Sequence, residues 1–133
     1  MIKQIAVFLE NQSGKASACC KALKNAGVNL RALTIADTKE FGIVRIIADD
    51  HAKALTALKD AGFLATSVDV VAVEVPDTSG ALAQLLILLG EAGVSVEYMY
   101  SFAGEDNHAK IAFKTSSPDK AEAILKEAGA KVL

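Results

Sequence analysis

The sequence has few of the residues that mark disulfide-rich, metal-binding, nucleic-acid-binding or membrane proteins. It contains two cysteines, two prolines, no tryptophan and a formal net charge of −2. Cys19 and Cys20 are adjacent, so they cannot build a framework of disulfides, and they supply too few ligands for a metal site. The lack of a basic excess predicts no nucleic-acid partner. The longest apolar run, residues 81–89, is interrupted by Gln84 and falls short of the ~20 residues that span a bilayer, so no membrane association is expected.

The composition is instead that of a soluble globular protein. Hydrophobic residues make up 52% of the chain and charged residues 23%, which supplies enough apolar material for an ample core. The first residues enter an alternating strand pattern directly, without the features of a secretion signal. We therefore expect a cytoplasmic location.

The chain is an internal duplication. Ser13-Gly14 recurs as Ser79-Gly80, and Ala61-Gly62 recurs as Ala128-Gly129. The spacing between the copies increases by one residue between these two pairs. This predicts a one-residue insertion in a loop of the second copy, since loops tolerate insertions. A duplication of this length predicts two structural repeats of the same fold.

Each copy shows the order strand, helix, strand, strand, helix, strand. Ile5, Val7 and Leu9 alternate with their neighbours, as expected for a strand with one buried face. Both helical segments of a copy repeat apolar residues at helical spacing and end before a glycine. The order predicts an α+β fold made of two ferredoxin-like βαββαβ repeats, residues 1–69 and 70–133, each with an antiparallel sheet and helices on one face.

The second strand of each copy is expected to follow the helix-ending glycine at once. One face of that strand is then predicted to carry Val28, Leu30 and Ala32 in the first copy, and Val94, Val96 and Tyr98 in the second. The last strand of each copy is expected at residues 63–68 and 130–133.

The first sheet is predicted to be apolar on both faces. The residues assigned to the side away from the helices are Leu33, Ile35, Phe41, Ile43 and Ile47. In the second copy, Ile87 and Leu88 lie outside the buried stripe of their helix. A sheet that is apolar on both faces needs a second covering layer. We therefore predict a homo-oligomer, with a homodimer as the expected state.

No group of residues indicates catalysis. His51 and His108 do not correspond in the two copies, and neither belongs to a nucleophile motif. Asp49 and Asp50 precede a helix, where carboxylates act as caps and interact favourably with the helix dipole. The two cysteines correspond to leucines in the second copy and are expected in the core. We therefore expect a protein that is not an enzyme and holds no cofactor or metal.

The turn between the first strand and the first helix is the candidate binding feature of each copy. Gly14 and Gly80 leave backbone N–H groups accessible to a carboxylate, which the helix dipole also favours. Asn11 and Asp77, three residues earlier, can accept hydrogen bonds from an ammonium group. Together these groups describe a site for a zwitterion. The alternative is that the polar residues of the turn only cap the helix.

The turn Asp77-x-x-Gly80-x-Leu82 resembles that of the ACT domain, and two such units cover essentially the whole chain. Phe8-Leu9-Glu10-Asn11 and Glu97-Tyr98-Met99-Tyr100-Ser101-Phe102 are similar to segments of small bacterial stand-alone proteins built from two ACT units. ACT domains bind amino acids and regulate enzymes of amino-acid metabolism. The resemblance thus implies an allosteric regulatory protein with a free amino acid as its ligand and an enzyme of amino-acid metabolism as a possible partner.

In that family the ligand lies between the strand-to-helix turn of one unit and the second strand of a neighbouring unit. The turn residues implied are Asn11, Ser13, Gly14, Asp77, Ser79, Gly80 and Leu82. The strand residues implied are Asn29, Leu30, Arg31, Val96, Glu97, Tyr98 and Met99. The first copy has Asn11 where an acidic residue is usual and Ala16 where a leucine is usual, so its site is expected to be weaker, altered or empty.

Two classes of function are left open. The leading hypothesis is a non-catalytic amino-acid sensor whose state is sensed by a partner enzyme. The alternative is a regulatory subunit that acts by protein contact on an amino-acid biosynthetic enzyme, like the small subunit of acetolactate synthase, without a ligand of its own. A third class is a small ferredoxin-like enzyme, but the sequence offers no catalytic group for it.

Tyr98 and Tyr100 are expected to share a strand face unless a bulge intervenes. They act there either as packing residues or as the lining of a ligand pocket.

Overall fold

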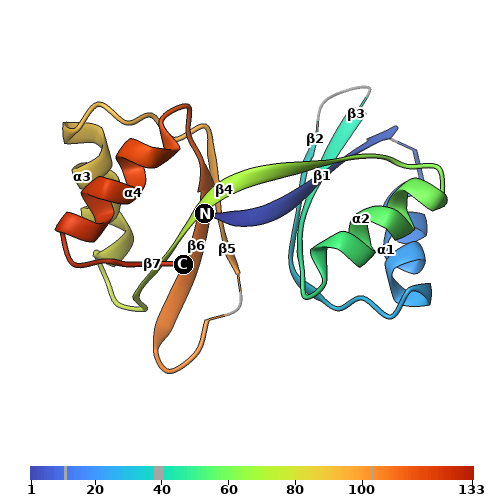
Figure 1. Ribbon diagram of the computed structural model, residues 1–133, viewed down its shortest axis with the longest axis horizontal. Helices are drawn as coiled ribbons and strands as arrows, with labels where there is room; N and C mark the ends of the chain where they lie inside the picture. Colours follow the sequence, from blue (N-terminus) through green and yellow to red (C-terminus); the bar gives the residue numbers. More distant parts are fainter. Residues whose placement is uncertain (11, 38–40, 103) are drawn as a thin grey trace. The chain divides into compact units, whose positions relative to one another are not determined.

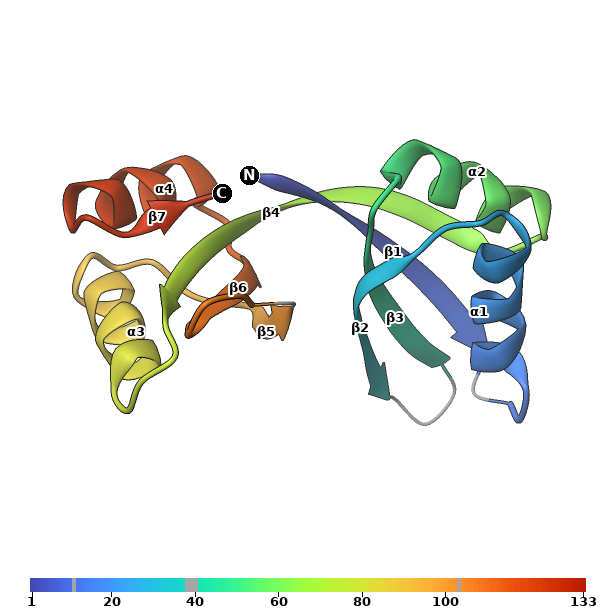
Figure 2. The same ribbon diagram turned by 90° about the horizontal axis from the view of Figure 1, so that it is seen from below.

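The computed structural model describes residues 1–10, 12–37, 41–102 and 104–133. The chain divides into two compact units, which are described in turn. The N-terminal unit is Lys3–Val68, and the C-terminal unit is Asp69–Leu133 together with Met1–Ile2. In each unit, two helices cover one face of the strands (Figures 1 and 2).

The N-terminal unit has the predicted βαββαβ order. Its elements are β1 (Ile2–Glu10), α1 (Lys15–Asn25), β2 (Leu30–Asp37), β3 (Phe41–Ala48), α2 (His51–Asp60) and the first part of β4 (Leu64–Pro76). The strands lie in the order β2-β3-β1-β4, and β3 is antiparallel to both of its neighbours. This strand order is that of a ferredoxin-like unit, so the predicted fold is confirmed.

The N-terminal core lies between α1, α2 and the sheet. Ile5 pairs with Ile46 across β1 and β3, and Val7 pairs with Val44. All four side chains are at most 1% exposed, and Leu58 of α2 is fully buried against the same cluster. Burial of side chains of this size stabilises a fold by about 1.5–3 kcal/mol each. The alternating pattern of β1 therefore identified its buried face correctly.

A bulge at the start of β2 changes which of its residues face the helices. Leu30 pairs with Ala48, whereas Ala32 pairs with Ile47, so two steps along β2 oppose one step along β3. Leu30 consequently packs against the core, and Ala32 lies on the opposite face. The prediction that these two residues share a face is wrong, because the bulge breaks the two-residue period.

The same bulge places Leu33 and Ile35 on the helix side of the sheet. Leu33 pairs with Ile46 and Ile35 pairs with Val44, both of which are core residues. Their side chains are 41% and 53% exposed nonetheless, because β2 is an edge strand. Their assignment to the other face is wrong. The residues assigned correctly to that face are Phe41, Ile43 and Ile47.

The C-terminal unit repeats the arrangement. Its elements are the second part of β4, α3 (Ala81–Glu91), β5 (Tyr98–Phe102), β6 (His108–Lys114), α4 (Pro118–Glu127) and β7 (Lys131–Val132). β6 is antiparallel to β4 and β5, and β7 pairs with β4. The core includes Val73, Phe113, Leu89 and Leu125, each at most 1% exposed.

Three strands differ in extent from the prediction. The last strand of the first copy and the first strand of the second are one continuous strand, β4, of 13 residues. β5 begins at Tyr98 rather than Val94, whose N–H donates to the Leu89 carbonyl oxygen at 2.9 Å and whose side chain is buried. Val94 and Val96 therefore lie outside the strand. β7 contains only Lys131–Val132.

The first helix of each copy ends as predicted. Gly27 and Gly93 follow α1 and α3 with φ of 71° and 75°, a conformation that glycine adopts at little cost. Val28 then donates its N–H to the Leu23 carbonyl oxygen at 3.0 Å, which satisfies an otherwise unpaired helix-end acceptor.

Among the described residues, no helix is long and apolar enough to cross a bilayer.

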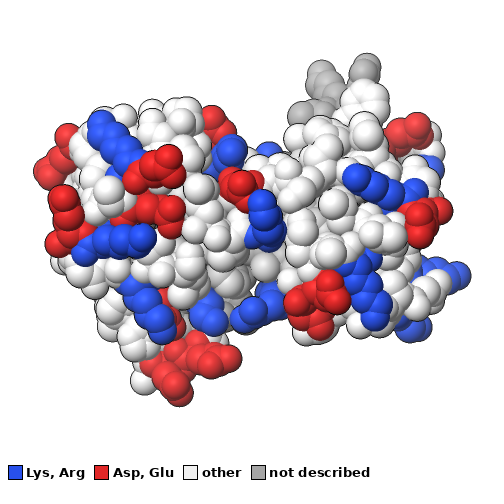
Figure 3. All heavy atoms as spheres, viewed as in Figure 1, with Lys and Arg blue, Asp and Glu red and all other residues white. Residues whose placement is uncertain are grey.

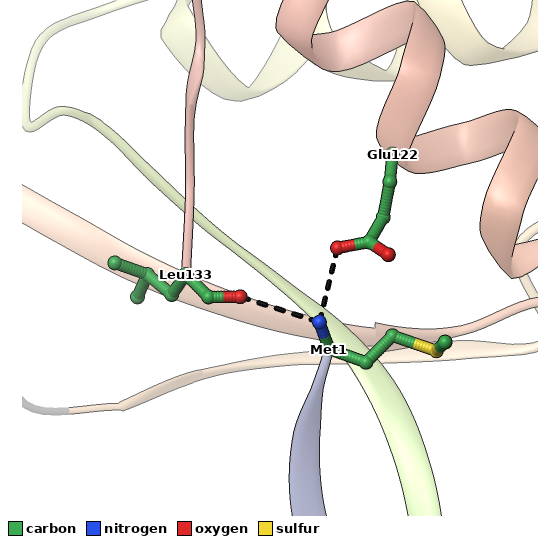
Figure 4. A network of polar contacts seen from close by, with 3 residues as sticks. All are labelled: Met1, Glu122 and Leu133. Carbon is green, nitrogen blue, oxygen red and sulfur yellow. Dashed lines mark hydrogen bonds and ion pairs between the residues drawn. The ribbon is translucent and has the colours of Figure 1, made fainter.

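The first residue of the chain contacts the last within the C-terminal unit. The Met1 ammonium group lies 3.0 Å from Glu122 Oε2 and 3.4 Å from the carbonyl oxygen of Leu133 (Figure 4). Met1–Ile2 belongs to the same compact unit as residues 69–133.

Candidate functional site

The predicted turns open helices α1 and α3 in the same backbone conformation. Gly14 precedes α1 with φ 86° and ψ −7°, and Gly80 precedes α3 with φ 86° and ψ −9°. A residue with a Cβ is strained in this left-handed region, so glycine is the residue that fits. The turn of the first copy is thus reproduced closely in the second.

No side-chain cap is present at α1 or α3 among the residues that the structure describes. α2 is capped normally, because the Asp50 carboxylate accepts a hydrogen bond from the Lys53 N–H at 3.1 Å. Within the described part of the chain, no side chain does this for α1 or α3. The first intrahelical bond of α3 runs from Gln84 N–H to Gly80 at 3.0 Å, so the Leu82 and Ala83 N–H groups precede it. Among the described residues, the turn before α3 therefore shows no side-chain cap.

The turn residues are accessible. Ser13, Gly14, Asp77, Ser79 and Gly80 are exposed, and Leu82 is 43% exposed. Asn11 lies outside the described residues. Exposed amides at a helix N-terminus, combined with the positive end of the helix dipole, favour an anionic group.

The predicted strand residues do not meet the turn of their own unit. Asn29, Leu30 and Arg31 follow α1, whereas the turn precedes it, and 11 helical residues separate the two ends by about 16 Å. The Asn29 backbone is paired with Asp49, whose carboxylate accepts from the Asn29 N–H at 3.0 Å. Leu30 packs on the core, and Arg31 is exposed.

The second copy shows the same separation. Val96 and Met99 pack on the core, and the exposed Glu97 donates its N–H to the Lys114 carbonyl oxygen at 2.8 Å. Tyr98 pairs with Lys114 on β6, whereas Met99 pairs with a buried phenylalanine. Tyr98 and Tyr100 therefore share the face away from α3 and α4, as the residue spacing predicts.

A cavity of about 870 Å³ adjoins the turn of the C-terminal unit. Thr78, Ser79 and Ala81 contribute to its wall, together with the end of α4 and the loop between β5 and β6. Of the three turn residues, only Ser79 is among the site residues that the sequence predicts. One sequence feature could have pointed to the loop as part of the cavity wall. It is the one-residue insertion in the second copy, which falls in the region of Glu105 and Asp106.

One charged pair stands at the edge of this cavity. Lys131 Nζ lies 2.9 Å from Glu74 Oε2. The hydrogen bond from Lys131 lowers the pKa of Glu74, and the positive charges of Lys131, His108 and Lys110 act in the same direction against a smaller opposing effect of burial. Glu74 is therefore held ionised.

Cys19 belongs to the N-terminal core rather than to a reactive site. Cys19 is 1% exposed and packs in the N-terminal core, as predicted. Burial, with the neighbouring Cys20, raises the pKa of the Cys19 thiol to about 11. The thiol is therefore protonated at neutral pH, which makes it a poor nucleophile. Cys20 is half-buried.

The ACT domain pair family matches residues 1–132 of the chain. The chain belongs to this family. ACT pairs are typical of regulatory, small-molecule-binding proteins, and ACT domains are non-catalytic. The predicted family is therefore confirmed over essentially the whole length.

Solved structures share the fold of this ACT pair. Protein BT0572 from Bacteroides thetaiotaomicron is 43% identical, with a TM-score of 0.91 over 98% of this chain and 90% of that one. The regulatory subunits of aspartate kinase from Thermus thermophilus, in a ligand-free form, and from Thermus flavus are 17% and 18% identical, with TM-scores of 0.65 and 0.62. Each covers 95% of this chain and 91% of its own. No curated protein matches the chain.

Proposed function

We propose that this ACT pair is a non-catalytic regulatory protein that binds a free amino acid at the turn before α3, and more weakly at the equivalent turn before α1. The observation that carries the proposal is the start of α3 at Gly80 without a side-chain cap. An α-carboxylate bound there receives hydrogen bonds from the Leu82 and Ala83 N–H groups. Ligand binding that favours one conformation can then be sensed by an enzyme of amino-acid metabolism.

Asp77 is the proposed acceptor for the ammonium group. Its side chain is exposed and makes no hydrogen bond among the described residues, while its backbone N–H donates to Asn107 at 2.7 Å. The carboxylate is therefore positioned by the backbone and has no competing partner within the described part of the chain. Ser79 supplies a hydroxyl on the same turn. The first copy carries Asn11 in place of this carboxylate, which is the reason for its weaker binding.

We propose that the strand residues of the site come from a second chain. Asn29–Arg31 and Val96–Met99 each lie a helix length away from the turn of their own unit. In a homodimer, the second chain can bring such a strand to the turn. We therefore propose a homodimer whose partner chain supplies the strand residues, in a cytoplasmic location consistent with free cysteines.

Thermal unfolding against the twenty standard amino acids tests the proposal. A ligand at ~100 times its dissociation constant adds about 2.7 kcal/mol to stability. Asp77→Ala should reduce the stabilisation to the weaker response of the first turn while leaving the unfolding temperature without ligand nearly unchanged, since no cap is lost. Asp50→Ala is the matched control, because it removes a real cap, at a cost of about 1 kcal/mol, and should keep the ligand response. An undiminished response in Asp77→Ala contradicts the assignment.

The second candidate function is a regulatory subunit that acts by protein contact. It is favoured by the outer face of α3, where Leu82, Leu86 and Ile87 are 43%, 40% and 58% exposed. No charged residue occurs between Ala81 and Gly90. Contiguous exposed apolar side chains mark interaction surfaces. An absence of any amino-acid response, together with binding of an amino-acid biosynthetic enzyme that is lost in Ile87→Glu, would favour this function.

A further inference from the structure

The face of the C-terminal sheet that turns away from α3 and α4 carries a row of aromatic side chains. Tyr98, Tyr100 and Phe102 alternate along β5, which is an edge strand. Met99, which lies between the first two, pairs with Phe113, a fully buried residue of the core under the helices. The three aromatic residues therefore share the helix-free face, and successive Cα atoms of the row are about 7 Å apart along the strand.

Lysines stand beside the ends of this aromatic row. Across the two strands, Tyr98 pairs with Lys114 and Phe102 pairs with Lys110. The Cβ atoms of directly opposed residues are about 4.5–5.5 Å apart, so each of these rings has an ammonium-bearing side chain as its neighbour. β5 thus supplies rings, and β6 supplies positive charges next to them.

The local charge of this face is positive, although that of the whole chain is not. Lys110 pairs with Glu74 of β4, and Glu74 pairs in turn with Lys131 of β7, with 2.9 Å between Nζ and Oε2. Together with Lys114, three ammonium groups share the face with one strand carboxylate. The expectation of no nucleic-acid partner was based on the net charge of −2, which averages over the chain and does not report this local excess.

The acidic β5–β6 loop limits this surface at one end. Glu105 and Asp106 are exposed there, and Figure 3 shows acidic side chains gathered over that loop with basic ones beside them. In the middle of the face, Ala72 and Ala112 are fully buried. The accessible part therefore consists of the partly exposed aromatic and lysine side chains around them, so a ligand on this face meets rings and ammonium groups together.

The first copy shows that the fold itself does not require these residues. Its equivalent cross-strand pairs are Ala32–Ile47, Thr34–Arg45 and Ala36–Ile43. They occupy the same register as the three pairs of β5 and β6. Two alanines and a threonine thus fill the aromatic positions, and isoleucines fill the two lysine positions. Because the same sheet forms with small residues on its edge strand, the aromatic row is an addition to the second copy.

We infer that this face binds single-stranded nucleic acid, with bases stacked on the rings of β5 and phosphates beside the lysines of β6. Aromatic side chains stack bases of any kind, and neighbouring cations hold the backbone. In RNA-recognition modules, a four-stranded sheet uses its aromatic residues in this way. The bases of a duplex already stack on one another, so the ligand is a single strand. This binding is independent of the proposed amino-acid function.

Fluorescence anisotropy of a labelled oligodeoxythymidylate tests the stacking, with a strand of about 12 nucleotides and the full chain. Tyr100→Thr and Phe102→Ala introduce the residues of the first copy. Each should weaken binding about tenfold, because one stacked base is lost. Tyr100→Phe keeps the ring and is the matched control, with binding unchanged. Circular dichroism checks folding, and if one ring variant fails to fold, the other decides.

Lys110→Gln tests the phosphate contact and leaves the rings intact. It should weaken binding and reduce the slope of log affinity against log salt concentration by about 0.7, the value for one phosphate contact on a single strand. Lys126→Gln removes the same charge from an exposed position on α4 and should change neither quantity. This pair of variants decides if neither ring variant folds.

Four results would overturn the inference. The first is no binding at low salt with about 100 µM protein, since even non-specific binding to nucleic acid has dissociation constants of about 1–100 µM. The second is competition by the annealed duplex as effective as that by the single strand. The third is unchanged binding in folded Tyr100→Thr and Phe102→Ala. The fourth is an equal loss in Lys110→Gln and Lys126→Gln, which would assign binding to overall charge.

Discussion

The backbone N–H of Asp77 donates a hydrogen bond to the carbonyl oxygen of Asn107 at 2.7 Å. This bond joins the turn before α3 to the loop between β5 and β6, two segments that both border the cavity. Asp106 and Asn107 hold the loop with φ of 52° and 60°, a region that Asp and Asn tolerate better than other side chains. The carboxylate proposed for the turn and the carboxylates of the loop are therefore positioned by one connected backbone structure.

Gly104→Ala tests the importance of this loop. A Cβ at Gly104 would collide with the carbonyl oxygen of His108, which is backbone and cannot rotate away. We expect a loss of about 1–3 kcal/mol in the free energy of unfolding, as for other overpacked sites, and a weaker response to amino acids. Thermal unfolding with and without ligand measures both effects.

Gly90→Ala is the control for that variant. A Cβ at Gly90, in the last turn of α3, meets nothing within 4 Å. Alanine has the higher helix propensity, so this variant should gain about 0.5–1 kcal/mol and keep its ligand response. Equal stability of the two variants would contradict the tight packing of the loop.

Gly14→Ala and Gly80→Ala separate backbone strain from ligand binding. Both glycines have φ of 86°, so alanine should cost about 1–2 kcal/mol at each position. The turn of Gly80 contains the carboxylate of Asp77, whereas the turn of Gly14 has Asn11 at that position. The loss of amino-acid response should therefore be larger in Gly80→Ala than in Gly14→Ala. Unfolding curves and ligand titrations of both variants provide the comparison. Equal losses of response would show that the two turns bind alike.

The fold was predictable because the chain repeats itself. Apolar alternation such as that of Ile5 and Val7 on β1, together with glycines after the helices, defines a βαββαβ unit without reference to distant residues. The errors arose where a local irregularity changes the period. The bulge between Leu30 and Ala32 depends on pairing with β3, which a single strand pattern does not reveal. The continuity of β4 likewise depends on partner strands from both repeats.

The candidate site was only partly predictable for a related reason. The turn at Gly80 is local in sequence, so its residue types sufficed. The cavity combines Glu74, Glu105 and Lys131, which are far apart in the chain and meet only because β4, β6 and β7 converge at one end of the unit. Conversely, Leu30 and Met99 were assigned to the site through family resemblance, but both pack against their own cores.

Lys131→Gln should reveal the pH dependence of the Glu74 pair. The pKa of Glu74 is lowered in the folded protein, chiefly by the Lys131 hydrogen bond, so its stabilising contribution is present above the unfolded pKa of about 4.3 and is lost as the pH falls through the folded value. The variant should therefore unfold at a lower temperature than the unaltered chain at pH 7, and this difference should shrink below about pH 4.

Lys126→Gln is the control for the change in net charge, since Lys126 is an exposed residue of α4. It should leave the unfolding temperature nearly unchanged at both pH values. A difference between Lys131→Gln and the unaltered chain that grows as the pH falls would contradict the assigned role of Glu74.

Ile87→Glu tests whether the outer face of α3 is an interface between two chains. Ile87 is 58% exposed, and its equivalent on α1 is Lys21, so this helix position accepts a charge without harm to the fold. If a second chain covers α3, burial of an unpaired carboxylate should cost the dimer about 3–5 kcal/mol. Sedimentation equilibrium should then show a dimer for the unaltered chain and a monomer for Ile87→Glu, while Lys21→Glu stays dimeric. A dimer that persists in Ile87→Glu would place the interface elsewhere and leave the apolar face of α3 to a different partner.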